Sequence, residues 1–323
     1  MPSAEDRRLR ALRPPKPEVD PWSLIDVLEE QELLADGRIA SSATFFLAGR
    51  ECPFTCVFCD LWQHTTDSPT PRGAIPKQIR EGLARLPAPG DHKTDTHGPR
   101  LIKLYNASNF FDAGAVPPSD DEEISRLVRD FDRVVVECHA RLVGRRCFEF
   151  ADRLDGRLEV AMGFETAHPA AFRHLNKSAE LDDLKKASDA LRHAGLGLRA
   201  FLLLDPPFVP VAERRAWLKD SVRFALDCGA STVWLIPLRG DSAEMRRLEQ
   251  GGHFEAPTLE RIEQGFADCR TIDPQSVRLD TWDLHRFTDD AGRDAERLQR
   301  LRDENLKAPG ETRVGGDDVG SFR

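Results

Sequence analysis

The stretch Thr44-Phe-Phe-Leu-Ala-Gly-Arg-Glu-Cys-Pro-Phe-Thr-Cys-Val-Phe-Cys-Asp60 carries three cysteines directly after a short apolar run. Cys52, Cys56 and Cys59 are spaced C-x3-C-x2-C, with Phe58 before the third cysteine. Three thiolates on one short loop can hold three irons of a 4Fe-4S cluster, whereas a cluster that only transfers electrons normally has four cysteine ligands. The spacing therefore predicts a 4Fe-4S cluster with one iron open to another ligand.

The alternative interpretation of the cysteine motif is a zinc site, or three unrelated buried thiols. Chance clustering is disfavoured, because the chain has only seven cysteines in 323 residues. Zinc would need a fourth ligand, and the nearby His64 stands at a spacing that fits common zinc patterns poorly. The remaining cysteines are scattered singly and are expected to be core thiols. They are Cys138, Cys147, Cys228 and Cys269.

The cysteine spacing together with Phe58 resembles the radical S-adenosylmethionine (radical SAM) superfamily. The resemblance implies that the open iron binds the amino and carboxylate groups of the methionine moiety of SAM. Reductive cleavage of SAM would then give a 5'-deoxyadenosyl radical that abstracts hydrogen from an unknown substrate. The resemblance further implies a low-potential electron donor of the flavodoxin or ferredoxin type, Phe58 as a wall for the adenine, and Trp62 or His64 at the cavity.

Composition sets outer limits on the function. The net charge of -9 argues against a broad nucleic-acid-binding face, which needs clustered Lys and Arg, but leaves a small basic entrance open. The first 13 residues are charged and no run of 18 apolar residues occurs, so neither a secretion signal nor a membrane span is expected. An oxygen-sensitive cluster held by reduced thiols is expected in the cytoplasm.

Residues 40–240 alternate between strand-like and helical patterns. Strands are predicted at 43–48, 100–106, 132–138, 157–164, 196–204 and 231–237, and helices near 76–86, 119–130, 141–154, 180–194 and 211–228. Repeated strand-helix units give a parallel sheet, and six units fall short of the eight of a complete barrel. The sequence therefore predicts an α/β fold with an open (β/α)6 partial barrel. The radical SAM resemblance implies the same TIM-like core.

The flanking regions carry weaker patterns. Residues 1–39 are predicted to form an N-terminal lead-in, loose over 1–20 and then helical from Asp20 to Leu34. Residues 87–99 are predicted to be a surface loop. Residues 241–323 are predicted to form a C-terminal extension with an added strand at 276–282, a charged helix near 290–305 and a disordered tail over the last 15 residues.

In parallel barrels the active site gathers at the carboxyl ends of the strands. The second predicted strand is followed by Asn106, Ala107 and Ser108, where radical SAM enzymes typically carry a Gly-Gly-Glu turn that takes the ammonium of the methionine moiety. This chain departs from that pattern. Asn106 and Ser108 can offer polar oxygens for the same role, or can bond local backbone in an ordinary turn.

The fourth predicted strand ends at Glu165, and Lys177 follows twelve residues later. The arrangement resembles the branch of the superfamily that contains the Elongator catalytic subunit and oxygen-independent coproporphyrinogen oxidase. The resemblance implies that Glu165 binds ribose hydroxyls and that Lys177 binds the carboxylate, at opposite ends of one SAM molecule. For Lys177 the alternative is a solvated charge at a helix start.

Two further charged residues stand at or inside predicted strands. Glu137 closes the third strand and is expected to contact either the cofactor or the substrate. Arg199 lies inside the fifth strand and needs a partner if it is buried. Glu165 or Glu137 could serve as that partner. The alternative for both Glu137 and Arg199 is a purely structural role.

Residues 60–66, together with 103–112, also resemble the radical SAM subunits of archaeosine synthases. This resemblance implies modification of a tRNA base as one function, with small-molecule chemistry as the enzymatic alternative. A non-catalytic iron-sulfur or zinc-binding protein on the same fold is the alternative of a different class. Glu165 and Lys177 argue against it, because a structural remnant would need neither.

Overall fold

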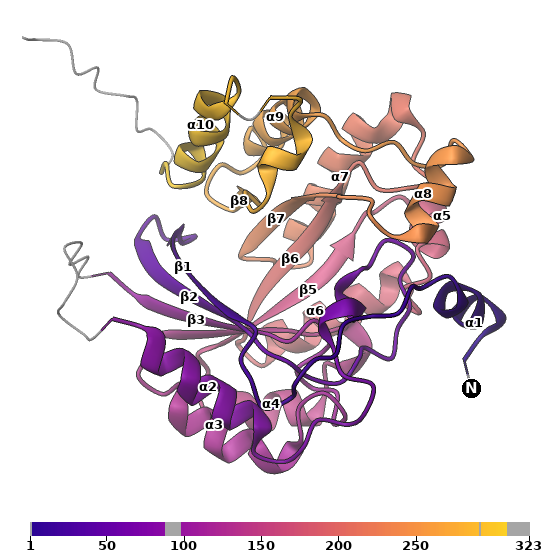
Figure 1. The fold of residues 1–323 in the computed structure, drawn as a ribbon. Coiled ribbons are helices and arrows are strands. Elements are labelled where there is room, and N and C mark those ends of the chain that lie inside the picture. Colours follow the sequence, from indigo (N-terminus) through magenta and orange to yellow (C-terminus); the bar gives the residue numbers. More distant parts are fainter. Residues whose placement is uncertain (1, 88–97, 291, 309–323) are drawn as a thin grey trace, which may run out of the picture.

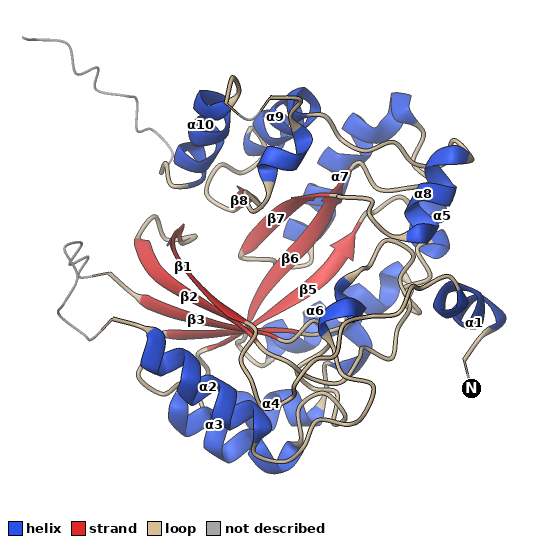
Figure 2. Cartoon of the chain, in the orientation of Figure 1, coloured by secondary structure: helices blue, strands red, loops and turns tan. Residues whose placement is uncertain are grey.

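The computed structural model describes residues 2–87, 98–290 and 292–308, and shows a curled sheet with helices on its outer face (Figures 1 and 2). The sheet has eight strands in chain order, of which β2 to β8 are parallel and β1 is antiparallel to β2. The predicted (β/α)6 partial barrel, from β2 to β7, is confirmed. The strands are β1 (Asp26–Leu33), β2 (Ile39–Phe46), β3 (Arg100–Tyr105), β4 (Arg133–Glu137), β5 (Leu158–Glu165), β6 (Gly197–Leu204), β7 (Thr232–Pro237) and β8 (Val277–Leu279).

Helices occupy most of the connections between the parallel strands, and their apolar faces form the main core against the sheet. They are α1 (Ala4–Ala11), α2 (Ala74–Arg85), α3 (Asp121–Leu127), α4 (Arg145–Asp152), α5 (Pro169–His174), α6 (Leu181–His193), α7 (Arg214–Asp227), α8 (Ala243–Gln250), α9 (Leu259–Arg270) and α10 (Ala295–Asn305). Short 3-10 helices span Leu61–His64, Pro118–Asp120, Ala140–Leu142, Val211–Glu213 and Leu284–Phe287. None of the described helices combines the length and apolar character needed to cross a membrane.

The helix predicted within residues 1–39 is wrong, because its residues form strand β1. The turn Asp36-Gly37 joins β1 to β2, with Gly37 at a φ of 84° and the Leu34 amide donating to the Arg38 carbonyl at 2.9 Å. An Asp-Gly pair between two strands is a strong hairpin signal that the apolar spacing obscured. β1 thus adds an antiparallel edge to the barrel.

The first 20 residues, predicted to be loose, contain helix α1. Ser3 caps the helix: its hydroxyl accepts from the Asp6 amide at 3.0 Å, while the Asp6 carboxylate accepts from the Ser3 amide at 2.7 Å. This reciprocal pair is a capping box, which stabilises the first helical turn. The Ser-x-x-Asp spacing of Ser3 and Asp6 indicates a helix start, which the prediction of a loose segment did not take into account.

The segment after residue 240 contributes to the sheet. The strand predicted at 276–282 is present as the shorter β8, and α8 and α9 precede it without having been predicted. The side-chain amide of Asn305, on α10, bonds the backbone of Leu279 in both directions, at 2.9 Å to its N–H and 2.6 Å to its carbonyl. The predicted tail and most of the predicted loop at 87–99 lie outside the described residues.

A chain of ion pairs crosses the inside of the curled sheet. Arg199 donates to Glu32 at 2.5 Å and to Glu159 at 2.8 Å, and Glu32 also binds Lys103 at 2.8 Å. The side chains of Arg199, Glu32 and Glu159 are each 1% exposed. The partners expected for Arg199, Glu165 or Glu137, were wrong. Its carboxylates come instead from the neighbouring strand β5 and from β1 across the barrel.

The two edge strands of the open sheet are also tied together. Arg278, on β8, donates to the carbonyl of Leu33, at the end of β1, at 3.0 and 3.2 Å. Because β1 runs antiparallel to the other strands, its last residue lies at their amino ends. The open sheet is therefore bridged at the end opposite the predicted active site.

Candidate functional site

The three predicted cysteines lie on the loop between β2 and α2, with their thiols partly buried. The Val57 amide donates to the Leu175 carbonyl at 3.1 Å and fixes the loop against the end of α5. Burial raises the pKa of Cys52 to about 11, and the pKa values of Cys56 and Cys59 to about 12. Thiols in this setting ionise when a bound metal supplies positive charge. Without a metal the three thiols therefore stay protonated at neutral pH, and ligation would release their protons.

Within the described ranges, no three His, Cys, Asp or Glu side chains are placed to share a single metal ion. A structural zinc ion needs four ligands that converge on one point. In a 4Fe-4S cluster each cysteine instead binds a separate iron.

Asn109 contacts the cysteine loop directly, and sequence reasoning missed it. Its Nδ2 donates to Cys52 Sγ at 3.1 Å, and its Oδ1 accepts from the His139 amide at 2.7 Å. The side chain is buried, so both bonds are shielded from water. Hydrogen bonds to ligand sulfurs tune the reduction potential of iron-sulfur clusters. The only sequence signal for Asn109 is its place shortly after the end of β3.

His139 links the cysteine loop to Lys177. Its ring stacks on Phe54 with centroids 3.8 Å apart. Burial, together with the Lys177 cation, lowers the pKa of His139 to about 3, so the ring is neutral. Nδ1 accepts from the Arg141 amide at 3.2 Å, which leaves Nε2–H to donate to the Lys177 carbonyl at 2.9 Å. The histidine thereby holds the backbone of Lys177 beside the cysteines.

Glu165 and Lys177 form a buried ion pair, with Lys177 Nζ 2.8 Å from Glu165 Oε1 and each side chain 7% exposed. Burial alone would lower the pKa of Lys177, but the Glu165 carboxylate and the Cys56 sulfur outweigh it and raise the pKa above its usual value. The solvated-charge alternative for Lys177 is wrong. The structure joins two residues that were predicted to bind opposite ends of one SAM molecule, so those roles require the pair to separate.

Several residues at the carboxyl ends of the strands have left-handed backbone conformations. They are Ala107 after β3, Glu165 at the end of β5, Asn176 and Ser178 on either side of Lys177, and Asp205 after β6. Such conformations are costly for residues other than glycine and concentrate at functional sites, where the surroundings enforce them. Glu165 also lies at a β-bulge that begins at Gly163. Strain and irregular pairing therefore mark this edge of the sheet.

Gly163 makes room for the Glu165–Lys177 pair. A Cβ atom at Gly163 would lie 2.0 Å from Glu165 Oε1 and 2.7 Å from Lys177 Nζ. We expect Gly163→Ala to displace both side chains and to lower the free energy of unfolding by about 1–3 kcal/mol, measured by urea denaturation. The control is Gly144→Ala, where a Cβ would meet no atom within 4 Å and the expected loss is below about 1 kcal/mol. Equal losses in the two variants would contradict the steric argument.

Asn106 and Ser108 lie where the ammonium of SAM was expected to bind. Asn106 is fully buried, and neither its Nδ2 nor its Oδ1 has a hydrogen-bond partner in the described part of the chain. The buried Oγ of Ser108 is equally unpartnered there. The ordinary-turn alternative, in which these side chains bond local backbone, is wrong. Buried polar groups are nearly always hydrogen-bonded, so these atoms fit a polar ligand.

Phe58 and Glu137 occupy different surroundings. Phe58 is partly buried against an apolar cluster that includes Leu203, at the end of β6, and Leu238, after β7. Glu137 closes β4, and burial raises its pKa to about 7. The ring of Phe58 thus lies in an apolar setting, whereas the carboxyl group of Glu137 can gain or lose a proton near neutrality.

A cavity of about 260 Å³ lies beside Cys56 and Cys59. Its walls include Trp62 after the cysteines, Leu9 of α1, and residues at the start of α8. The guanidinium of Arg13 stacks over Trp62 at 4.8 Å from the ring centroid. Trp62 lines this cavity and His64 does not. Glu165 and Lys177 are not among its lining residues either, so the place of Trp62 beside a cofactor stays a prediction.

Comparisons with known proteins show which sequences this chain is similar to. No family model matches the chain. Over 155 residues it is 28% identical to archaeosine synthase subunit beta of Thermococcus kodakarensis, an alignment that covers 46% of each chain. Over 225 residues it is 21% identical to an uncharacterised protein of Methanocaldococcus jannaschii, covering 66% of this chain and 60% of that one. In both cases the matched part is less than two thirds of the relative's length.

A solved structure shares the fold. Elp3 of Methanocaldococcus infernus, with an N-terminal deletion, superposes with a TM-score of 0.54 at 15% identity, covering 72% of this chain and 60% of that one. At this level of identity the likeness concerns the fold alone. The curled, partly open barrel of this chain is therefore similar to the fold of a protein whose structure has been solved.

Proposed function

We propose that this chain, which is related to the radical SAM superfamily, is an enzyme that cleaves S-adenosylmethionine reductively at a 4Fe-4S cluster held by Cys52, Cys56 and Cys59. One observation carries the proposal. The cysteine loop adjoins a barrel edge where buried polar groups, Asn106 and Ser108, are unpartnered and where Glu165 and Lys177 form a buried ion pair. Thiols, polar acceptors and paired charges are the groups that such a cofactor pair requires.

Each residue of the candidate site has a separate proposed role in binding SAM. When bound, the cluster and SAM would supply a 5'-deoxyadenosyl radical, and the protein would supply orientation and enclosure. The unpartnered oxygens of Asn106 and Ser108 would accept from the methionine ammonium. Lys177 would donate to its carboxylate and Glu165 would accept from the ribose hydroxyls, which requires their mutual pair to open. Phe58 would contact the adenine.

The substrate and partners belong to the same proposal. The match to archaeosine synthase subunit beta supports modification of a tRNA base over small-molecule chemistry. The net charge of -9 would confine tRNA contacts to a small basic entrance. The same match supports a second polypeptide as a partner, because that relative is one subunit of a synthase. A flavodoxin- or ferredoxin-type donor would supply the low-potential electron.

Anaerobic reconstitution with iron and sulfide tests the proposed function. The protein should become brown and bind about four irons, and addition of dithionite and SAM should release 5'-deoxyadenosine. Stoichiometric zinc in place of iron would overturn the cluster assignment. A complete cluster that never yields 5'-deoxyadenosine would instead favour the non-catalytic alternative.

The SAM-binding roles of Lys177 and Glu165 give a quantitative prediction. Each side chain would make charge-assisted hydrogen bonds, so we expect Lys177→Ala and Glu165→Gln to weaken SAM binding by about 10- to 150-fold. Calorimetry on reconstituted proteins measures the affinity, and iron content serves as the internal check. Lys185→Ala, which removes a half-exposed lysine on α6, should bind SAM normally. Unchanged affinity in both site variants, with normal iron, would place the cofactor elsewhere.

A further inference from the structure

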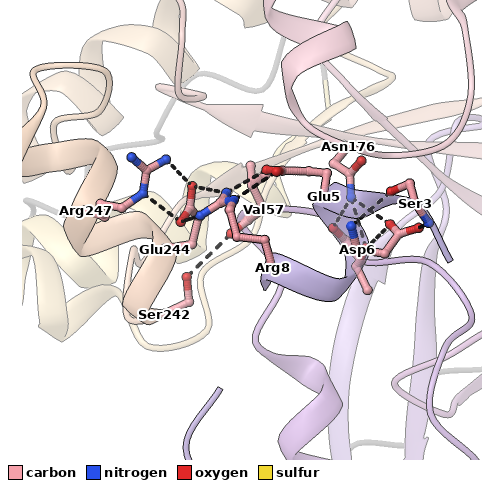
Figure 3. A network of polar contacts seen from close by, with 10 residues as sticks. Ser3, Glu5, Asp6, Arg8, Val57, Asn176, Ser242, Glu244 and Arg247 are labelled. Carbon is pink, nitrogen blue, oxygen red and sulfur yellow. Dashed lines mark hydrogen bonds and ion pairs between the residues drawn. The ribbon is translucent and has the colours of Figure 1, made fainter. Parts of the chain in front are cut away.

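Helix α1 contacts both segments that build the candidate cofactor site (Figure 3). The hydroxyl of Thr55 donates to Asp6 Oδ1, and Asn176 Nδ2 donates to the same oxygen at 3.1 Å. Asn176 Nδ2 also reaches the Thr55 carbonyl at 2.9 Å. Thr55 directly precedes Cys56, and Asn176 directly precedes Lys177. Asn176 Nδ2 lies 2.9 Å from the Thr55 hydroxyl as well, so the two segments bond each other directly and also share one carboxylate oxygen of Asp6.

Two other contacts hold α1 in this place. Arg8 donates to both oxygens of Glu244, on α8, at 2.8 and 2.9 Å (Figure 3). Leu9 is buried in the apolar cluster that contains Val57 and Leu175. A helix of eight residues is too short to be stable alone. Its position is fixed by these contacts with the loop and with α8.

The turn around Lys177 needs external support. Asn176 and Ser178, on either side of the lysine, have φ values of 52° and 57°. Left-handed residues persist only where neighbouring groups hold them. The Asp6 carboxylate provides such a group, and the hydrogen bonds from Thr55, Ser3 and Asn176 hold the pKa of Asp6 well below its usual range. Its charge makes each of these bonds stronger than a neutral equivalent.

We propose that Asp6 is a positioning residue of the cofactor site, holding Thr55 and Asn176 together and so fixing Cys56 relative to Lys177. The proposal rests on the proposed function for the identity of the cofactor. It assigns to α1, which lies outside the predicted barrel core, a part in shaping the site. Asp6 would act on the cofactor site through Thr55 and Asn176, which it bonds directly.

The first experiment uses the protein without cofactor, so it does not depend on the proposed function. The alkylation rate of Cys56 by iodoacetamide is measured by peptide mass spectrometry in the wild type and in Asp6→Ala. We expect the rate in the variant to rise about tenfold or more, because loss of charged hydrogen bonds of this kind favours opening by that factor. Ser3→Ala removes the other half of the capping box and Glu5→Gln removes a neighbouring carboxylate. Glu5→Gln should stay within about twofold of the wild type. Ser3→Ala, which removes the cap of α1, should raise the rate by about fivefold or less.

The second experiment follows SAM binding to the reconstituted protein, by calorimetry and by the change that SAM makes in the spectrum of the reduced cluster. Asp6→Ala should keep its iron but bind SAM about 10- to 30-fold more weakly. Glu5→Gln should match the wild type, and Ser3→Ala should lose less affinity than Asp6→Ala. Equal alkylation of Cys56 in Asp6→Ala and wild type would overturn the inference, as would equal effects of Ser3→Ala and Asp6→Ala. A wild type that binds no SAM would overturn the proposed function, while the alkylation result would still decide whether Asp6 holds the loop.

Discussion

Replacing Cys56 with alanine is expected to abolish both the cluster and the release of 5'-deoxyadenosine. Two thiolates cannot hold the three irons that the loop is proposed to bind, so no partial activity should remain. Iron analysis, the visible spectrum and product detection after anaerobic reconstitution measure the result together. Before reconstitution the wild type and variant should unfold at similar urea concentrations, because Cys56 is a free thiol and its replacement removes no disulfide.

Cys228→Ala is the matched control for Cys56→Ala. Cys228 is a buried thiol at the end of α7, apart from the cysteine loop. Its replacement should leave iron content and product formation intact. Loss of iron in this control would show that the assignment of a single cluster to the loop is wrong. Retention of a full cluster by the Cys56 variant would show that Cys56 is not a ligand.

Replacing Glu32 with glutamine is expected to lower the free energy of unfolding by about 3–5 kcal/mol. The change leaves Arg199 without one of its two carboxylate partners and Lys103 with only Glu30. A buried cation that loses its counter-charge is strongly destabilising. Urea denaturation measures the effect. Glu30→Gln is the control: that side chain is 37% exposed, so its loss should cost about 1 kcal/mol or less.

The effect of Glu32 should also depend on pH. Burial alone would raise the pKa of Glu32, but the Arg199 and Lys103 cations outweigh it and lower the pKa from 4.5 to about 2. A carboxyl whose pKa is lower in the folded state stabilises the protein above its unfolded pKa and ceases to do so as it becomes protonated. The difference between wild type and Glu32→Gln should therefore be constant above pH 4.5 and shrink as the pH falls toward 2. A difference that grows on acidification would contradict this account.

The barrel core could be predicted because each of its strands is recognisable from a few consecutive residues. Strands β2 to β7 are buried parallel strands, and most of their residues form short apolar runs in the sequence. The partners of the barrel's charges are not local. Glu32 is 167 residues from Arg199, and Glu30 is 73 residues from Lys103. The spacing of residues within β1 gives no information about such distant partners. The glutamates of β1 that face the barrel interior were therefore interpreted as the polar face of a helix.

In the candidate site, too, features set by neighbouring residues were predictable and contacts between distant residues were not. The cysteine loop was singled out from spacing alone, because three thiols proposed to bind one cluster must lie on one short stretch of chain. The contact between Glu165 and Lys177 depends on a β-bulge and on the missing side chain of Gly163, which spacing does not encode. Asn109 and Asp6 act on the loop from other elements. Their residue types are common at turns and helix starts, so their sequence positions carry no distinguishing signal.

The side chain of Asn305 protects the edge strand β8 from pairing with a strand of another molecule. A sheet that stops short of closure exposes unpaired backbone groups along its last strand, and another polypeptide can extend the sheet by binding there. Asn305 occupies the N–H and carbonyl of Leu279 on β8, and so mimics a neighbouring strand within the same molecule. Strand addition at this edge would first have to displace α10. The open barrel can thus keep its incomplete architecture without offering β8 as a seed for aggregation.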